Sequence, residues 1–326
     1  MKRYRTCAVG TGVVLALTGC GTGPGTSSTG PGQALPSTGG SPSARPSSAA
    51  SRPQGSRTAS VADITPLGAE HETVGVGFPI IVTFSRPVTE RTAVENALEV
   101  RAERPVEGAW RWLDARTVVY RTRTYWSPHQ KVRFTARLTG VRMAKGVYGA
   151  KDVTRTFAVG ASQISIVDTR RHQMTVRRDG KVARRIPISA GRGGHLKDGT
   201  DVYLTASGVH LVMEKERVAR MTSAWMGVDP KSPQGYDEQI PWAVRITRTG
   251  EYVHQSDGAY QFLGVSNQSH GCVRATPAGA RWFFGIAHRG DVVEVTGTAR
   301  RLDWRNGWSF WQLPWDTWRA SPQITS

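Results

Sequence analysis

The sequence predicts a mainly β protein with two folded domains. The chain has 326 residues, which is long enough for about two domains. Short apolar runs bounded by Gly and Pro recur after residue 61, a pattern that is typical of strands joined by turns. Residues 21–60 consist largely of Gly, Ser, Thr, Pro and Ala, and such a segment buries too little apolar surface to fold. The folded part is therefore expected to begin near residue 62.

The first residues have the pattern of a bacterial export signal. Basic residues precede an apolar run over residues 8–17, which is too short for a typical membrane-spanning helix. The run ends in Leu17-Thr18-Gly19-Cys20, which resembles a lipobox, the motif whose cysteine is lipidated and becomes the new N-terminus. We therefore expect residues 1–19 to be a signal peptide and the exported protein to be anchored by lipid on Cys20, at the outer face of the cytoplasmic membrane or in the cell wall. Ordinary cleavage, with the cysteine incidental, is the alternative.

Residues 20–61 are expected to form a disordered linker, and residues 62–159 an all-β sandwich. Several short apolar runs at regular spacing predict the sandwich. Trp110 and Trp112 are better explained as core or interface residues than as a ligand platform. The expected strands contain residues 80–84, 117–120, 131–134 and 156–159, and a short helix is expected near residues 90–98.

Residues 160–297 are predicted to form a second β-rich domain that begins with a hairpin. Residues 173–178 and 181–189 alternate apolar and polar side chains around Asp179-Gly180, which is a strong hairpin signal. A second hairpin is expected to join residues 243–248 to residues 251–254 through Thr249-Gly250.

One main helix and a Trp-rich extension complete the predicted fold. Thr276 is expected to cap the helix, with Pro277 at its first position and Gly290 at its end. A strand over residues 291–295 follows. Residues 298–326 carry five Trp residues, an aromatic surface that is expected to pack on a domain or a domain interface rather than face water. Glycan binding is the alternative. The helix is expected to bury Ala280, Phe283, Phe284 and Ala287.

The strong positive charge limits the classes of partner. The formal net charge is +18, which is compatible with nucleic acid, an anionic membrane or an anionic polymer. The export signal argues against nucleic acid. Attraction to anionic cell-wall polymers, weakened by salt, is therefore one interpretation, and a solvated basic surface is the other.

Cysteine usage singles out one thiol. The chain has three cysteines. Cys7 lies in the predicted signal peptide and Cys20 is the predicted lipid site, so Cys272 is the one thiol expected in the mature protein. An unpaired thiol outside the cytoplasm is exposed to oxidation, which suggests a reactive role.

The residues around this thiol suggest nucleophilic catalysis. Cys272 precedes the predicted helix, whose N-terminal dipole would favour a thiolate. His254 lies eighteen residues earlier, at the end of a predicted strand, and would serve as the base. Gly271 lets the backbone approach a ligand closely, so the amides of Gly271 and Cys272 are candidate donors to an oxyanion. Zinc requires three or four ligands, and no second cysteine completes such a set. A buried, inert cysteine remains an alternative.

These residues also resemble a known family. His254 and the run Ser269-His270-Gly271-Cys272, followed by Arg274, resemble the signature of the YkuD-type L,D-transpeptidases. Residues 74–82 are similar to the Ig-like module of the multidomain lipoprotein members, and residues 313–320 to their C-terminal tail. The resemblance covers residues 62–320. It implies an Ig-like β-sandwich followed by a β-rich YkuD-type catalytic domain.

The resemblance implies a role for each residue of the site. It makes Cys272 the nucleophile and His254 the general base and later acid, oriented by the main-chain carbonyl of Gln255. The amides of Gly271 and Cys272 would line the oxyanion hole with the Tyr236 hydroxyl. His270 would shape the site, and residues 217–236 would be a mobile lid. The implied substrate-binding residues are Tyr236, Ser269, Arg274, Met221 and Trp242.

Two positions depart from the pattern of the multidomain lipoprotein members of the family. Arg274 stands where those members carry Asn, and Met226 stands where they carry Tyr. These differences are expected to alter contacts with substrate and β-lactams rather than abolish activity. His195 is better explained as a loop or packing residue, and Asp257 as an exposed loop aspartate.

The implied activity is 3→3 cross-linking of peptidoglycan, without a cofactor or a metal. Cys272 would attack a donor tetrapeptide stem at its third residue, release the terminal D-Ala and leave a thioester. An amine of an acceptor stem would then attack that thioester. Carbapenems are the implied inhibitors. Two alternatives stay open: an L,D-carboxypeptidase, in which water is the acceptor, and a wall-binding module with an inactive site.

Overall fold

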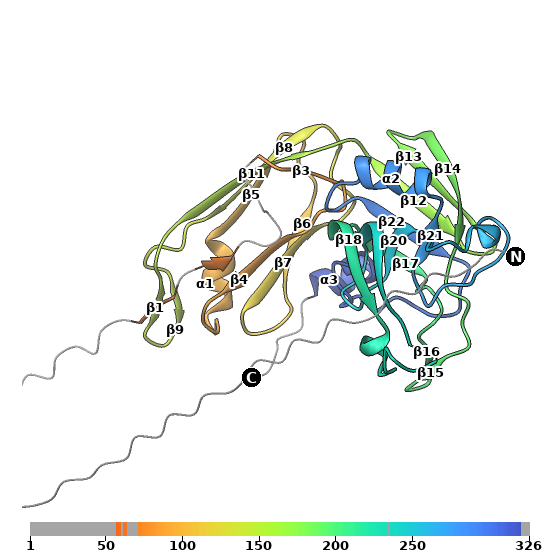
Figure 1. Ribbon diagram of the computed structural model, residues 1–326. Coiled ribbons are helices and arrows are strands. Elements are labelled where there is room, and N and C mark those ends of the chain that lie inside the picture. Colours follow the sequence, from red (N-terminus) through yellow and green to blue (C-terminus); the bar gives the residue numbers. More distant parts are fainter. Residues whose placement is uncertain (1–56, 60, 64–70, 234, 321–326) are drawn as a thin grey trace, which may run out of the picture. The chain divides into compact units, whose positions relative to one another are not determined.

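The computed structural model describes residues 57–59, 61–63, 71–233 and 235–320, and it confirms a mainly β protein (Figure 1). The expected signal peptide and Cys20 lie outside these residues. All described elements belong to one compact unit, Pro53–Ser326. None of the helices in the described part of the chain is long and apolar enough to cross a membrane.

The first domain is the predicted Ig-like sandwich. Two four-stranded sheets contribute to one core that includes Phe84, Trp112 and Phe134, so Trp112 is a core residue as expected. The expected short helix is α1, Arg91–Asn96. One sheet has the order β3 (Thr73–Val74), β11 (Val153–Val159), β8 (Gln130–Ala136), β5 (Leu98–Ala102); the other has the order β2 (Val61–Asp63), β4 (Ile80–Phe84), β7 (Thr117–Thr122), β6 (Gly108–Trp112).

A small third sheet reaches into the segment that was assigned to the linker. Strand β1 (Arg57–Ala59) pairs in parallel with β10 (Val147–Gly149), which pairs with β9 (Arg142–Ala144). Paired structure is therefore present inside residues 20–61. The backbone ladder to β10 is a contact between distant residues, so the local composition gave no sign of it.

The second domain is built on a nine-stranded sheet. Its strand β20 (Tyr252–Gln255) lies in parallel beside β21 (Val273–Ala275), with His254 opposite Arg274. Alternation along a strand places Cys272 on the same side of this ladder as Arg274 and His254. The sheet order is β17 (Gly208–Leu211), β22 (Val292–Thr296), β12 (Gln163–Asp168), β13 (Gln173–Arg178), β14 (Lys181–Ser189), β21, β20, β19 (Asp237–Arg245), β18 (Glu214–Thr222); β15 (Leu196–Lys197) and β16 (Thr200–Asp201) pair separately.

The two hairpin predictions have different outcomes. The first is confirmed at both strands, and Asp179 and Gly180 have φ values of 46° and 79°, as a type I′ turn requires. The second has the wrong register. Ile246 donates its N–H to the Glu251 carbonyl (2.9 Å), so the turn spans residues 247–250 rather than centring on Thr249-Gly250. The Thr247 hydroxyl accepts the Glu251 N–H at 2.8 Å and stabilises this longer, four-residue turn.

The main helix begins where the sequence predicted. Helix α2 spans Pro277–Ile286, and the Thr276 hydroxyl accepts the Gly279 N–H at 3.1 Å. Phe283 is fully buried in the core of the second domain. Strand β21 intervenes between Cys272 and this helix, so the thiol does not lie at the helix N-terminus, contrary to the expectation from the sequence.

The Trp-rich extension packs on the first domain, as the sequence predicted. The Arg121 guanidinium on β7 donates to the Phe310 carbonyl (2.8 Å) and lies 4.9 Å from the ring centroids of both Trp311 and Trp318. Burial lowers the pKa of Arg121 to about 10. Trp318 is fully buried and donates its Nε1–H to the Ala109 carbonyl (3.0 Å). The short helical elements are η1 (Ser223–Met226), η2 (Tyr260–Phe262), η3 (Phe310–Gln312) and α3 (Trp315–Arg319).

Two glycines allow the two domains to share a backbone contact. Gly75 donates its N–H to the Arg289 carbonyl (2.8 Å), and Gly77 donates to the Gly290 carbonyl (2.9 Å). The Arg289 guanidinium also pairs with Glu72. A Cβ at position 75 would lie 2.1 Å from the backbone nitrogen of Asp291. The junction therefore requires a residue without a side chain.

Gly75→Ala is expected to lower the free energy of unfolding by about 1–3 kcal/mol, because the added methyl group would overlap Asp291. Gly285→Ala is the matched control: among the described residues no atom outside its helix lies within 4 Å of the added Cβ, and alanine favours a helix. Urea unfolding measures both. A Gly75→Ala protein as stable as the Gly285→Ala control would contradict the close approach.

Candidate active site

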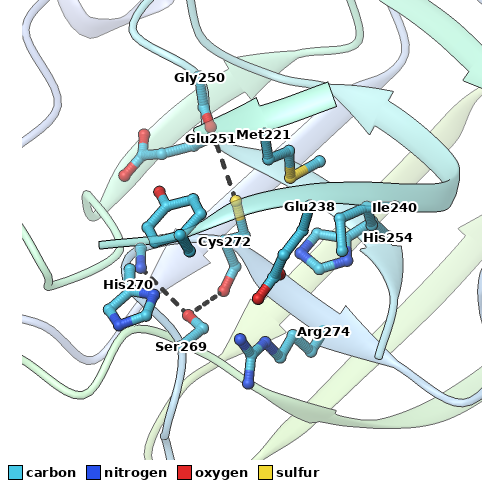
Figure 2. A pocket seen from close by; sticks show the side chains of 12 residues that line it. Met221, Glu238, Ile240, Gly250, Glu251, His254, Ser269, His270, Cys272 and Arg274 are labelled. Atoms are coloured by element: carbon cyan, nitrogen blue, oxygen red, sulfur yellow. Dashed lines mark hydrogen bonds between the residues drawn. The ribbon is translucent and has the colours of Figure 1, made fainter. Parts of the chain in front are cut away.

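One cavity holds most of the predicted site. It lies between the β18–β19 pair, strand β20 and the loop that precedes β21 (Figure 2). The sequence-predicted residues Cys272, His254, His270, Gly271 and Ser269 meet here although the chain separates them by up to eighteen residues. The full lining is Met221, Tyr236, Glu238, Ile240, Gly250, Glu251, His254, Ser269, His270, Gly271, Cys272 and Arg274.

Hydrogen bonds fix the loop that carries the thiol. The Ser269 hydroxyl donates to the Cys272 carbonyl (2.6 Å) and accepts the Gly271 N–H (3.1 Å). The Thr205 hydroxyl donates to the Gly271 carbonyl (2.8 Å). Gly271 has a φ of 129°, a conformation that favours glycine.

The Gly271 amide, which was expected in the oxyanion hole, is engaged within the protein. Its N–H is bonded to the Ser269 hydroxyl. The sequence pattern suggested the amide because glycine allows close approach, but a hydroxyl two residues earlier competes for the same N–H. The roles expected for the Cys272 amide and the Tyr236 hydroxyl remain predictions.

His254 is held as a neutral base. Its Nδ1 lies 2.6 Å from the carbonyl oxygen of Gln255, the partner that the resemblance implied. That contact places the proton on Nδ1 and leaves the Nε2 lone pair free of a proton. Burial lowers the pKa of His254 to about 4, and the Arg274 charge adds to the shift. The imidazole is therefore uncharged at neutral pH.

The thiol is also uncharged in this state. The Cys272 thiol donates to the Gly250 carbonyl at 3.6 Å (Figure 2). Burial raises the pKa of Cys272 to about 12, despite the nearby Tyr252 N–H, which lowers it. The helix dipole that the sequence suggested does not act on this thiol, because β21 separates the two. The resting site is a neutral thiol beside a neutral imidazole rather than a preformed ion pair.

A buried ion pair supports the floor of the cavity, and sequence reasoning missed it. Glu251 is 2% exposed and pairs with Arg300 at 3.0 Å. Glu251 also accepts the Ala206 N–H (2.9 Å), while Arg300 donates to the Leu204 carbonyl (2.7 Å). The pair thereby joins the start of β20 to residues 204–206, the segment whose Thr205 hydroxyl bonds to Gly271. The two charged residues lie 49 positions apart in the chain, and neither belongs to a recognisable motif.

Aromatic rings surround His270. Its ring stacks on Tyr236 with a centroid distance of 4.9 Å and meets the edge of Tyr203 at 4.8 Å. His195 stacks on Tyr203, which agrees with the packing role expected for it. Burial lowers the pKa of His270 to about 4, and the Arg192 charge contributes. His270 is therefore a neutral wall of the cavity.

The predicted substrate-binding residues do not all reach the cavity. Met221 and Arg274 line it, and the Arg274 guanidinium lies 3.1 Å from the Asp257 carboxylate. Asp257 is an exposed loop residue, as expected, and it also pairs with this arginine. Trp242 does not line the cavity: its φ is 54°, and its ring packs on Phe284 of α2 at 5.3 Å. This left-handed backbone conformation turns the half-buried side chain onto α2, which spacing alone does not reveal.

The predicted lid contains paired structure. Its first part, residues 217–222, belongs to β18 and pairs with β19, and η1 follows. The side chain of Met226 lies outside the described residues. Among the residues that the structure describes, no group of three or more His, Cys, Asp or Glu is arranged to hold a metal ion.

Comparison with known proteins identifies both domains. A bacterial Ig domain model matches residues 47–142, and the model of the YkuD L,D-transpeptidase catalytic domain matches residues 162–295. L,D-transpeptidase 1 of Mycobacterium tuberculosis is 32% identical over 237 residues, which are 73% of this chain and 85% of that protein. L,D-transpeptidase 2 of the same organism is 34% identical over 78% of this chain. The chain spans 60% of the length of L,D-transpeptidase 2 and 54% of that of L,D-transpeptidase 5.

Solved structures show the same fold. The complex of LD transpeptidase LdtMt1 with imipenem has a TM-score of 0.60 at 32% identity, over 73% of this chain and 99% of that chain. L,D-transpeptidase 3 from Mycobacterium tuberculosis, with a faropenem-derived adduct, has a TM-score of 0.58 at 29% identity, over 73% of this chain and 98% of that chain.

Alkylation of Cys272 tests the neutral resting state. Because its thiol pKa is raised to about 12, the rate with iodoacetamide is expected to be low at pH 7 and to rise about tenfold per pH unit toward pH 10. The urea-unfolded chain, followed on the same peptide by mass spectrometry, is the control and should titrate as an ordinary thiol. A fast rate that stays flat from pH 6 to pH 9 in the folded protein would indicate a thiolate–imidazolium pair instead.

Proposed function

The chain belongs to the YkuD family of L,D-transpeptidases, with a bacterial Ig domain before the catalytic domain, and from this membership we propose that it forms 3→3 peptidoglycan cross-links through a thioester on Cys272. One observation carries the proposal. A thiol and a neutral imidazole line one cavity: His254 lies on β20, and Cys272 directly precedes β21, the parallel strand paired with it.

The first half of the proposed reaction forms the thioester. The Cys272 sulfur attacks the carbonyl carbon of the third residue of a donor stem, and its proton passes to Nε2 of His254. The C–N bond to the terminal D-Ala then breaks, and His254 returns the proton to the departing amine. His254 suits both steps because its low pKa keeps it unprotonated before the attack and acidic after it.

The second half releases the product. An amine of the acceptor stem attacks the thioester carbon and loses a proton to His254. The C–S bond breaks, the new amide leaves, and the thiolate regains that proton. In each half of the reaction, one proton moves to His254 and is then returned. Neither the thiolate nor the imidazolium therefore has to persist in the cavity, where burial disfavours charge.

β-Lactams of the carbapenem class are proposed to acylate the same sulfur. Solved relatives include a complex with imipenem and a faropenem-derived adduct. Here the C–N bond of the lactam ring would open, the ring nitrogen would take the proton, and the thioester would remain on Cys272.

Cys272→Ala is expected to abolish tetrapeptide processing and the carbapenem adduct while leaving the melting temperature nearly unchanged, because the substitution removes one sulfur atom. Intact-mass spectrometry of the protein, together with chromatography of the peptides, measures both. Turnover by Cys272→Ala would refute the nucleophile. Free tripeptide without dimer from the wild type would indicate the carboxypeptidase, and no adduct with either ligand would indicate an inactive wall-binding module.

We also propose that the protein is exported and anchored by lipid on Cys20, as the lipobox-like run indicates. The net charge of +18 would further attract the protein to anionic wall polymers. Cys20→Ser is expected to move the protein from the membrane fraction to the soluble exported fraction, because the lipid attachment point is lost. Cys7→Ser is the control and should stay in the membrane fraction. Membrane retention of Cys20→Ser in high salt would contradict lipid anchoring.

A further inference from the structure

An acidic side chain stands in an otherwise apolar wall of the Cys272 cavity. Strand alternation turns Tyr236, Glu238 and Ile240 to the same side, and all three line the cavity. Met221, directly opposite Glu238 on β18, lines it too. A half-buried carboxylate among these side chains loses hydration, so its presence requires a reason.

The neighbouring acids all have a cationic partner within the protein. Asp257 pairs with Arg274 at 3.1 Å, Asp237 with Arg220 at 2.7 Å, and Glu251 with Arg300 at 3.0 Å. The side chain of Glu238, in contrast, makes no hydrogen bond or ion pair within residues 71–233 and 235–320. Figure 2 shows its carboxylate in the cavity with Cys272 and Arg274 nearby.

Glu238 is placed to act on a ligand rather than on the catalytic pair. The charges that shift the pKa of Cys272 belong chiefly to Glu251, Arg274 and Arg245, and those that shift the pKa of His254 to Arg274 and Asp257. Burial and then the Asp257 carboxylate raise the pKa of Glu238 itself, while Arg274 lowers it. Both histidines are neutral, and Arg274 pairs with Asp257. Within the part of the chain that the structure describes, Glu238 is thus the carboxyl group of the cavity lining that has no ion-pair partner. A cation is the ligand that its negative charge favours.

Glu238 also lies where a substrate must pass. It lines the Cys272 cavity and two further depressions beside it. One depression runs along His195, Tyr203 and His270, and the other along Asp257 and Tyr260. A peptide that reaches the sulfur from either side therefore passes this carboxylate.

We propose that Glu238 binds the primary ammonium group at the end of a diamino acid side chain in the stem peptide. The inference rests on the proposed function, in which the third stem residue carries such an amine in both the donor and the acceptor. An alkyl ammonium has a pKa near that of lysine, about 10.4, so it enters the cavity charged. A hydrogen bond between two ionised groups in a partly buried site is stronger than a neutral one. Glu238 thereby selects stems whose third side chain ends in an amine. An acceptor ammonium first releases its extra proton to water, and the neutral amine then attacks and passes its next proton to His254 as in the proposed reaction.

Glu238→Gln, which keeps the shape and removes the charge, tests the proposal in single-turnover experiments on the full chain. Asp237→Asn is the matched control: it is the adjacent residue of β19, is exposed, and pairs with Arg220 away from the cavity. Acylation by faropenem, which carries no amine, is expected to change less than about twofold in either variant. In Glu238→Gln, the rate of a step that involves a stem amine should fall about tenfold or more, the effect expected from the loss of a charged hydrogen bond.

Two arms distinguish the source of the ammonium. A loss in thioester transfer to an acceptor stem, with acylation unchanged, assigns Glu238 to the acceptor. A loss in acylation by a tetrapeptide donor with a free side-chain amine, but not by the same donor with that amine acetylated, assigns it to the donor. Either result supports the proposal.

Other outcomes overturn it. Equal rates for Glu238→Gln and wild type in both arms would show that no ammonium is bound here. An equal loss for every substrate, faropenem included, would show a structural role. If the wild type forms no thioester on Cys272 with any substrate, the proposed function itself fails, and this result is separate from a loss of amine selectivity.

Discussion

The burial of an imidazole on β20 and of a thiol just before the neighbouring strand β21 is the constraint on which the rest of the site depends. Burial raises the pKa of Cys272 to about 12 and lowers that of His254 to about 4, because an enclosed site disfavours both charged forms. The two groups therefore rest as a neutral pair. In the proposed reaction, such a pair becomes nucleophilic when a carbonyl arrives and the proton moves to Nε2. The neutral thiol is also less open to oxidation, since the thiolate is the reactive form.

The surrounding structure keeps these two side chains in place without adding charge to them. The contact between His254 and the Gln255 carbonyl fixes the tautomer, and the Ser269 and Thr205 hydroxyls fix the loop of Gly271. The Glu251–Arg300 pair, together with the bond from the Ala206 N–H to Glu251, connects the residue before β20 to the segment that carries Thr205. Arg300 lies in the first residues of the Trp-rich extension, just after β22. The segment that packs on the Ig-like domain therefore also supplies a charge to the wall of the cavity.

Features encoded by neighbouring residues could be predicted from the sequence. Asp179-Gly180 specifies a type I′ turn by itself, and Thr276-Pro277 specifies a helix start, so both were placed correctly. The His254–Cys272 spacing, together with the family resemblance, placed both residues in one cavity.

Features that depend on side-chain geometry or on distant contacts could not be predicted. The register after Thr247 is set by the bond that its hydroxyl accepts from the Glu251 N–H, a choice that turn composition does not reveal. The orientation of Trp242 is set by a positive φ and by contact with Phe284. The Glu251–Arg300 pair and the position of the Glu238 carboxylate in the cavity depend on how distant strands pack, so they are known only from the structure. The state of the thiol was misjudged for the same reason: the sequence showed a nearby helix but not the burial that outweighs it.

The charge state of His254 is the most direct test of the central claim. Nitrogen-15 chemical shifts of the histidine rings in the folded protein at pH 6, assigned by comparison with His254→Gln, report it. The account predicts a neutral ring with its proton on Nδ1 and a bare Nε2. A doubly protonated ring at pH 6 to 7 that becomes neutral in Cys272→Ala would reveal a thiolate–imidazolium pair and contradict the account.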